Sequence, residues 1–316
     1  MTTGPRLRTV VQNLVFQNPI VLAAGTAGYG EELADVVRLD ALGGFVTKAV
    51  SREPRAGAPA PRVAEFEGGM MNAVGLANPG LDAVRREHVP WLASHLPGTR
   101  KFVNVVGFTT DEFAEVVAGL EEVLGGPQAS AVDAYEINVS CPNVKAGGME
   151  FGADPAALKV VVAGVRRATR RPVFVKLSPV LPNICDAARI AADAGADGIS
   201  VVNTIPGLLV DIERRRPVLG FGTGGVSGPA ILPVGVLATW KVRGAVPLPI
   251  LGVGGVSSAE DALQYIMAGA SLVGIGTAAM RDPRAPERIV SGLEQWCARH
   301  NVNNIQELTG TLEWPH

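Results

Sequence analysis

The sequence predicts an α/β protein with the architecture of a (β/α)8 TIM barrel, and three observations support this prediction. Eight short runs rich in Val and Ile recur along the 316 residues and are apolar on both faces, as parallel strands buried beneath helices are. Amphipathic stretches of helical length separate the runs. Polar side chains stand at the C-terminal ends of the runs, where barrels of this kind carry their catalytic groups.

A hairpin is expected before the first strand, because residues 6–19 alternate apolar and polar positions on both sides of Gln12 and Asn13. We expect this hairpin to close the N-terminal mouth of the barrel. The eight strands are expected, in chain order, at IVLAAGT (20–26), GFVTKA (44–49), KFVNVVG (101–107), YEINVSCPN (135–143), VFVKLSP (173–179), GISVVNT (198–204), PILGVGG (249–255) and LVGIGT (272–277).

A helix is expected after each strand, and some of these helices carry start signals. Asp154 precedes a proline, which is typical of an N-cap with proline at the first helical position. Two capping boxes are predicted by the spacing of Thr109 with Glu112 and of Ser257 with Glu260.

Three connections are longer than usual, at 50–80, 141–153 and 205–228. All three follow strands, so we expect them on the catalytic face, where long loops form lids and walls. The sequence has no linker and no break in composition. A single domain over residues 1–316 is therefore expected.

Composition and charge exclude several classes of function. The 28 basic and 30 acidic residues give a net charge of −2, which offers no electrostatic footprint for nucleic acid or an anionic membrane. The sequence has no signal core and no apolar stretch long enough to span a membrane, so a cytoplasmic protein is expected. The three scattered cysteines exclude a disulfide framework, and they are too few to hold an iron–sulfur cluster.

Glycines cluster after the seventh and eighth strands, in GVGGVSS (252–258) and GIGT (274–277). In barrels these two loops often bind a phosphate through backbone N–H groups, which we favour over ordinary tight turns. A third pattern, formed by Gly220, Gly222 and Gly225, has the G-x-G-x-x-G spacing of a dinucleotide site. It lacks the acidic residue that such a site needs about 20 positions later, so we reject a dinucleotide site there.

Lysines and asparagines mark the expected catalytic rim. Lys48 and Lys176 each stand near the end of an apolar strand, where a lysine either extends to solvent or is held over a ligand. Two lysines at equivalent positions favour the binding of a delocalised anion. Asparagines can serve as turn residues, but amides at one rim also suit a planar, polar heterocycle. These amides belong to Asn72, Asn104, Asn138 and Asn203.

Cys141 is the candidate general base. It lies three residues past Asn138, where the fourth strand opens into a glycine-containing loop, it precedes a proline, and Lys145 lies close in sequence. A free cysteine is usually a small buried apolar residue, but a partly exposed thiol near cations can accept a proton at neutral pH. The sequence has no serine–histidine–acid arrangement and no metal-ligand spacing that would compete for the chemistry.

Six segments together resemble the dihydroorotate dehydrogenases, which are FMN-dependent barrels of pyrimidine (UMP) biosynthesis. The segments are MNAVGL (71–76), NVSCPNVKAGG (138–148), VKLSP (175–179), VVNT (201–204), GGVSGPA (224–230) and GVGG…GIGT. The resemblance covers about residues 14–284. The CPNVKxGG loop resembles class 1B, a catalytic subunit that passes electrons to NAD through an iron–sulfur flavoprotein. Class 2 enzymes are less similar, because they use serine as the base.

The resemblance implies one FMN per chain, with FAD and a [2Fe–2S] cluster on a partner subunit only. It also implies a homodimer core, which would form a heterotetramer with that partner. Implied flavin contacts are Ala24, Lys48, Ala49, Asn104, Asn138, Lys176, Val202, Gly228, Gly254, Gly255, Gly276 and Thr277. Implied substrate contacts are Lys48, Asn72, Ala73, Val74, Gly75, Leu76, Asn138, Asn203 and Thr204. Ala24 departs from the family pattern, which usually has a serine there.

The implied reaction is the oxidation of (S)-dihydroorotate to orotate, with Cys141 and Lys48 as catalytic residues. Cys141 removes the C5 proton while hydride leaves C6 for flavin N5, and Lys176 stabilises the charge that arrives on the flavin. Two close alternatives are a dihydropyrimidine dehydrogenase-type subunit and the fumarate-linked class 1A enzyme. A flavin-free isomerase and a non-catalytic scaffold subunit are alternatives from other classes. Metal is not expected.

Overall fold

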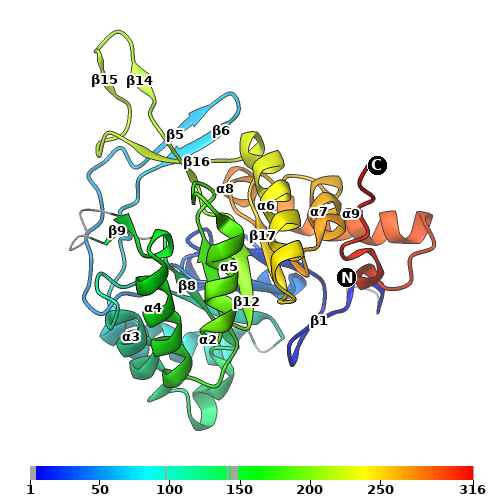
Figure 1. The fold of residues 1–316 in the computed structure, drawn as a ribbon, viewed down its shortest axis with the longest axis horizontal. Coiled ribbons are helices and arrows are strands. Elements are labelled where there is room, and N and C mark those ends of the chain that lie inside the picture. The colour runs from blue at the N-terminus through cyan, green and yellow to red at the C-terminus, as the bar shows by residue number, and fades with distance from the viewer. Residues whose placement is uncertain (1–4, 97, 141, 144–148, 316) are drawn as a thin grey trace.

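The computed structural model describes residues 5–96, 98–140, 142–143 and 149–315. Eight parallel strands form a closed barrel in which each strand pairs with its neighbours in chain order, and the last pairs with the first (Figure 1). The predicted (β/α)8 barrel is confirmed. Its strands are β3 (Ile20–Leu22), β4 (Gly44–Val46), β7 (Arg100–Val105), β8 (Ala134–Asn138), β11 (Val173–Leu177), β12 (Gly198–Val201), β17 (Ile250–Val253) and β18 (Leu272–Ile275).

Helices surround the barrel, with one departure from the expected order. The connection between β3 and β4 carries only two 3₁₀ helices, η2 (Glu31–Leu33) and η3 (Leu39–Ala41), so the expectation of a helix after every strand is wrong there. The α-helices and the one π-helix of the described residues are α1 (Leu81–Ala83), the π-helix η4 (Val84–His88), α2 (Val89–His95), α3 (Glu112–Glu121), α4 (Pro155–Ala168), α5 (Ile184–Asp193), α6 (Leu232–Ala245), α7 (Ala259–Ala268), α8 (Thr277–Arg281) and α9 (Ala285–Arg299).

The predicted N-terminal hairpin is present as β1 (Thr9–Val11) and β2 (Leu14–Phe16), which pair antiparallel. Phe16 is fully buried and lies 6.1 Å from Phe102 of β7, ring centroid to centroid, while Phe102 stands edge-on to Phe174 of β11. These rings belong to one buried apolar cluster with residues of most barrel strands. The hairpin therefore fills the N-terminal end of the barrel, and the open space lies toward the other end.

The helix start signals were predicted with mixed accuracy. Asp154 caps α4 by accepting hydrogen bonds from the backbone, as expected. The predicted box at Ser257 is wrong by one residue, because Ser258 caps α7 and pairs with Asp261. The box at Thr109 is also incomplete, since the Glu112 carboxylate accepts from the N–H of Phe108 instead.

Two of the long connections build a second sheet above the barrel, which the sequence did not reveal. The first contributes β5 (Val63–Phe66) and β6 (Gly69–Asn72), and the other contributes β13 (Ile205–Gly207) and β16 (Gly224–Ser227). The four strands form an antiparallel sheet in the order β13-β16-β6-β5 (Figure 1). The hairpin of β14 (Val210–Asp211) and β15 (Arg216–Pro217) projects beyond this sheet, and β9 (Pro142–Asn143) pairs with β10 (Met149–Glu150).

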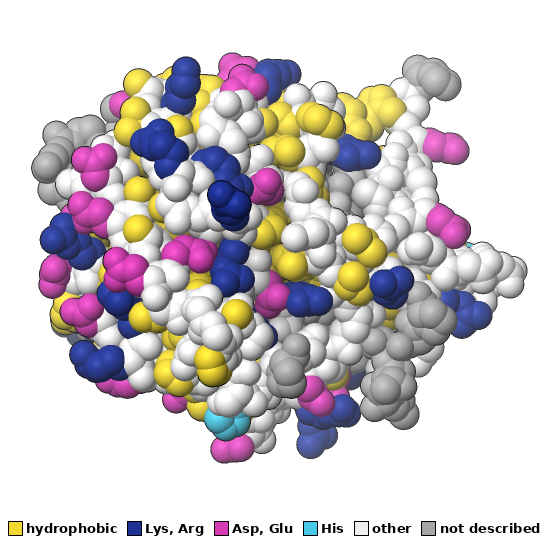
Figure 2. Space-filling model, turned by 90° about the horizontal axis from the view of Figure 1, so that it is seen from below, with side chains coloured by type: hydrophobic (Ala, Val, Ile, Leu, Met, Phe, Trp, Pro, Cys, Tyr) yellow, Lys and Arg dark blue, Asp and Glu magenta, His cyan; other side chains and the backbone are white. Residues whose placement is uncertain are grey.

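In the described part of the chain, no helix is long and apolar enough to cross a membrane. On the face drawn in Figure 2, Lys and Arg side chains alternate with Asp and Glu, which agrees with the nearly balanced charge.

Candidate active site at the carboxyl end of the barrel

A cavity of about 320 Å³ opens between the C-terminal ends of the barrel strands and the second sheet, a volume typical of small-molecule sites. It brings together most of the residues singled out in the sequence. Those that line it are Ala24, Lys48, Ala49, Asn72, Val74, Leu76, Asn104, Asn138, Lys176, Val202, Asn203, Thr204, Gly228, Gly254, Gly255, Gly276 and Thr277.

Two of the predicted residues, Ala73 and Gly75, are not among the described residues that line the cavity. The chain at Gly75 lies against the backbone of Ala58, and the N–H of Ala73 donates to the Arg62 carbonyl. Cys141 lies outside the described residues, although β8, which precedes it, ends at the cavity with Asn138.

The period of two along a strand explains why polar side chains line the cavity above an apolar floor. Residues two apart on a strand share a face, so Lys176 stands one layer above Phe174 on β11, and Asn104 one layer above Phe102 on β7. Both aromatic residues belong to the buried cluster inside the barrel, while the lysine and the asparagine reach the cavity. Each of these two strands thus changes from apolar to polar as it approaches the catalytic face.

A buried carboxylate lies beneath this polar layer and was not singled out in the sequence. Glu136 of β8 is 1% exposed, and its Oε1 accepts a 2.7 Å hydrogen bond from Nδ2 of Asn104. The same oxygen lies 3.7 Å from Nζ of Lys176. The available signal was an acidic residue in the apolar run YEINV, two positions before Asn138 and therefore on the same face of the strand.

The asparagines on the other side of the cavity contact one another and the second sheet. Nδ2 of Asn203 lies 3.4 Å from Oδ1 of Asn138, and Oδ1 of Asn203 accepts from the N–H of Thr204. Asn72, at the end of β6, donates a long hydrogen bond of 3.4 Å to the Gly225 carbonyl of β16. The convergence of amides that the sequence predicted is therefore present.

The glycine loops after β17 and β18 offer backbone donors to the cavity. Gly254 and Gly255 have φ values of +131° and +78°, which glycine adopts without strain. Among the described residues, the N–H groups of Gly254, Gly255 and Gly276 donate to no other protein group. Gly254 is buried and the other two glycines are partly buried, so these donors need a ligand or water, and an anion suits them.

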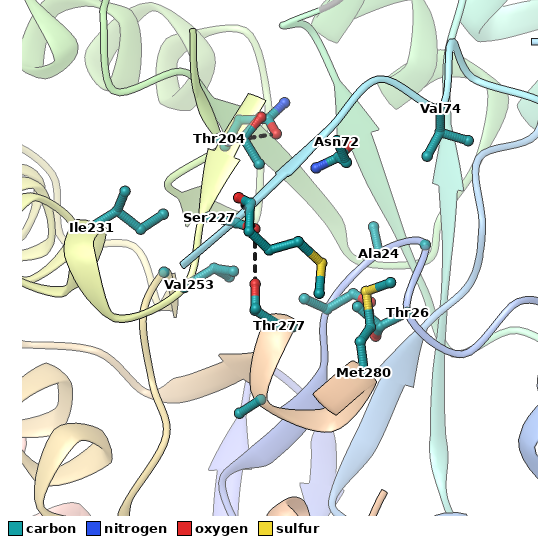
Figure 3. A pocket seen from close by; sticks show the side chains of 18 of the residues that line it. Ala24, Thr26, Asn72, Val74, Thr204, Ser227, Ile231, Val253, Thr277 and Met280 are labelled. Carbon is teal, nitrogen blue, oxygen red and sulfur yellow. Dashed lines mark hydrogen bonds between the residues drawn. The ribbon is translucent and has the colours of Figure 1, made fainter. Parts of the chain in front are cut away.

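Two hydroxyl groups lie beside these backbone donors, and the sequence analysis did not single out the one that belongs to Ser227. Oγ1 of Thr277 donates a 2.8 Å hydrogen bond to Oγ of Ser227, which lies in β16 of the second sheet. Figure 3 shows the two side chains pointing toward each other, with Thr26 and Met280 nearby on the same wall. Ser227 belongs to a long connection that has no strand pattern in the sequence. Its place at the cavity could therefore be recognised only once the second sheet was known.

Tyr265 fixes the first glycine loop from behind. Its hydroxyl donates a 2.7 Å hydrogen bond to the Gly254 carbonyl, and its ring is fully buried. Burial raises the pKa of Tyr265, and the nearby Asp261 carboxylate raises it further, so the phenol keeps its proton and remains a donor.

We expect Tyr265→Phe to lower the free energy of unfolding by about 1–3 kcal/mol, because the Gly254 carbonyl would be left buried without its partner. Urea unfolding of the ligand-free protein, followed by circular dichroism, measures this change. An unchanged unfolding midpoint would show that the hydrogen bond does not stabilise the loop.

Within the described residues, no group of three or more His, Cys, Asp or Glu side chains could hold a metal ion. The cavity instead combines backbone donors for an anion, two lysines and several amides above an apolar floor. Such a site can bind a phosphorylated planar cofactor next to a small polar ring.

Comparison with known proteins agrees with this geometry. The family model described as "Dihydroorotate dehydrogenase" matches residues 6–296. The chain is 46% identical over 309 residues to the "Dihydroorotate dehydrogenase B (NAD(+)), catalytic subunit" of Pelobacter propionicus, and equally identical to the protein of that name from Trichlorobacter lovleyi. A protein of the same name from a Geobacter species is 44% identical. Each alignment covers 98% of this chain and 99% of the relative. The chain therefore belongs to the dihydroorotate dehydrogenase family.

Proposed function

We propose that this chain is the FMN-binding catalytic subunit of an NAD-linked dihydroorotate dehydrogenase, which oxidises dihydroorotate to orotate in pyrimidine biosynthesis. The observation that carries the proposal is the cavity where lysines and asparagines at strand ends meet the two glycine loops. The relatives are named as catalytic subunits of the NAD(+) enzyme. We further propose that residues 1–316 form a single domain, located in the cytoplasm.

The residues present fit FMN. The N–H groups of Gly254, Gly255 and Gly276, which have no partner among the described residues, would hold its phosphate, assisted by the Thr277 hydroxyl. Lys48 and Lys176 would supply positive charge beside the ring, and Ala24, Ala49 and Val202 would contact it. Ala24 provides no hydroxyl, so any side-chain hydrogen bond at that position is absent.

FMN, when bound, supplies the acceptor for the hydride that leaves C6 of dihydroorotate. Residues of this chain remove the proton and orient the substrate. Cys141, as thiolate, removes the proton from C5. Asn72, Asn138 and Asn203 present donors and acceptors to the ring of the substrate, and Lys48 pairs with its carboxylate.

A partner subunit completes the proposed enzyme. The term "catalytic subunit" in the relatives' names implies a second chain in those enzymes. We propose that a partner carrying FAD and a [2Fe–2S] cluster passes the electrons to NAD. A homodimer of this chain would form the core of a heterotetramer, since symmetric pairing is the commonest form of assembly.

We expect the purified chain alone to oxidise dihydroorotate with a dye or oxygen as acceptor and to show little turnover with NAD. Adding the iron–sulfur flavoprotein should restore the reduction of NAD. A steady-state assay of the lone chain with NAD, then fumarate, then a dye makes this measurement. Fast NAD reduction by the lone chain would refute the two-subunit proposal, and fast fumarate reduction would place the protein in class 1A.

A further inference from the structure

Glu136 is an ionisable residue inside the barrel for which the proposed reaction has no direct use. Its side chain is not among those that line the cavity, yet it contacts two that do. Its Oε1 accepts a 2.7 Å hydrogen bond from Nδ2 of Asn104 and lies 3.7 Å from Nζ of Lys176. The three residues come from the adjacent strands β7, β8 and β11, so the barrel itself sets their spacing.

The contact with Asn104 fixes the orientation of that amide. An ionised carboxylate can only accept hydrogen bonds, so Asn104 must turn its NH2 group toward Glu136. The amide oxygen is then the atom of Asn104 that remains for a ligand in the cavity. With a neutral side chain in place of Glu136, either orientation of the amide would be possible.

The contact with Lys176 balances a buried charge. Lys176 is 7% exposed and Glu136 only 1%, and a charge removed from water is tolerated when an opposite charge lies close by. The carboxylate supplies that charge from the floor side of the cavity. This contact therefore holds the ammonium where the proposed function needs a cation.

We propose that Glu136 is a positioning residue that holds the Lys176 ammonium beside the flavin through their ion pair and fixes the orientation of Asn104. This inference rests on the proposed function, because it takes the cavity as the flavin site.

The test is a double-mutant cycle of Glu136→Gln and Lys176→Met, read out as the reduction potential of bound FMN. We expect Glu136→Gln to weaken the binding of reduced relative to oxidised FMN at least about tenfold, which lowers the two-electron potential by about 30 mV. When Lys176 is already methionine, Glu136→Gln should lower the potential no further. An equal fall in both backgrounds, no change, or a rise in the presence of Lys176 would overturn the inference.

The melting temperature of the flavin-free protein gives a second readout. Glu136→Gln alone should lower it by several degrees, because a buried ammonium loses its partner, and adding Lys176→Met should recover part of the loss. If Glu136→Gln fails to fold and the double variant folds, that recovery supports the pairing. If neither folds, Glu136 serves the barrel as a whole and the inference is wrong.

Glu121→Gln is the matched control. Glu121 is another paired carboxylate, 3.2 Å from Nε of Arg171 and hydrogen-bonded to Tyr135, and it does not line the cavity. Its loss should lower the melting temperature and leave the flavin potential unchanged. A wild-type protein that binds no FMN would refute the proposed function itself. A wild-type protein that dihydroorotate reduces, but without coupling in the cycle, would refute only the role of Glu136.

Discussion

Cys141→Ala is expected to slow the reduction of bound FMN by dihydroorotate about 100-fold or more, the usual effect of losing a general base. FMN should remain bound, because the proposed phosphate and ring contacts come from other residues. Stopped-flow absorbance of the flavin under anaerobic conditions measures the rate. Cys141→Ser should recover activity only at higher pH, since a hydroxyl is a much weaker acid than a thiol.

Cys185→Ala provides the control for this experiment. Cys185 lies in α5, outside the cavity, and its Sγ donates to the Lys241 carbonyl. Its removal should leave the rate of flavin reduction unchanged. A near-normal rate in Cys141→Ala at neutral pH would show that another group removes the proton.

Gly255→Ala is expected to weaken FMN binding about 100-fold or more. The added Cβ would lie 2.5 Å from the backbone nitrogen of Leu232, the first residue of α6, and the φ of +78° disfavours any side chain. The loop must move, and the donors of Gly254 and Gly255 would lose their alignment with the phosphate. Two hydrogen bonds to a charged group are together worth about 3–6 kcal/mol, which is 100-fold or more in affinity.

The dissociation constant of FMN, measured by quenching of flavin fluorescence, tests this prediction. Gly125→Ala is the matched control, because a Cβ at Gly125 would meet no atom within 4 Å. Retention of FMN by Gly255→Ala with normal affinity would refute the role of this loop in phosphate binding. Circular dichroism of the variant distinguishes loss of the site from loss of the fold.

The barrel could be predicted because each buried strand carries its own signal. A run such as VFVKL in β11 is apolar on both faces, and its lysine falls at the end that faces the cavity. The prediction of a helix after every strand did not hold between β3 and β4, where the connection carries two short 3₁₀ helices and β3 packs against the distant helix α9. The pattern of residues in a strand does not show which helix packs against that strand.

The site residues at the ends of strands could be predicted from the sequence. The site residues whose position depends on pairing between distant segments could not. Asn104 and Lys176 reach the cavity because the strand period places them there, and Lys48 reaches it two residues after the end of β4. Ser227 reaches it only because β16 pairs with β6, and neither strand has an alternating pattern. Glu136 was overlooked because a single acid in an apolar run reveals its partners only once the neighbouring strands are known.

The second sheet also has a consequence for the order of folding. Ser227 of β16 donates a hydrogen bond to the Met70 carbonyl of β6, a residue 157 positions earlier in the chain. Closing a loop of that length costs conformational entropy that local contacts cannot offset, so such pairings form late. Strands β7, β8, β11 and β12 lie between the two segments, and their pairing brings the segments together. We therefore expect refolding chains to acquire barrel secondary structure before they acquire the ability to bind FMN.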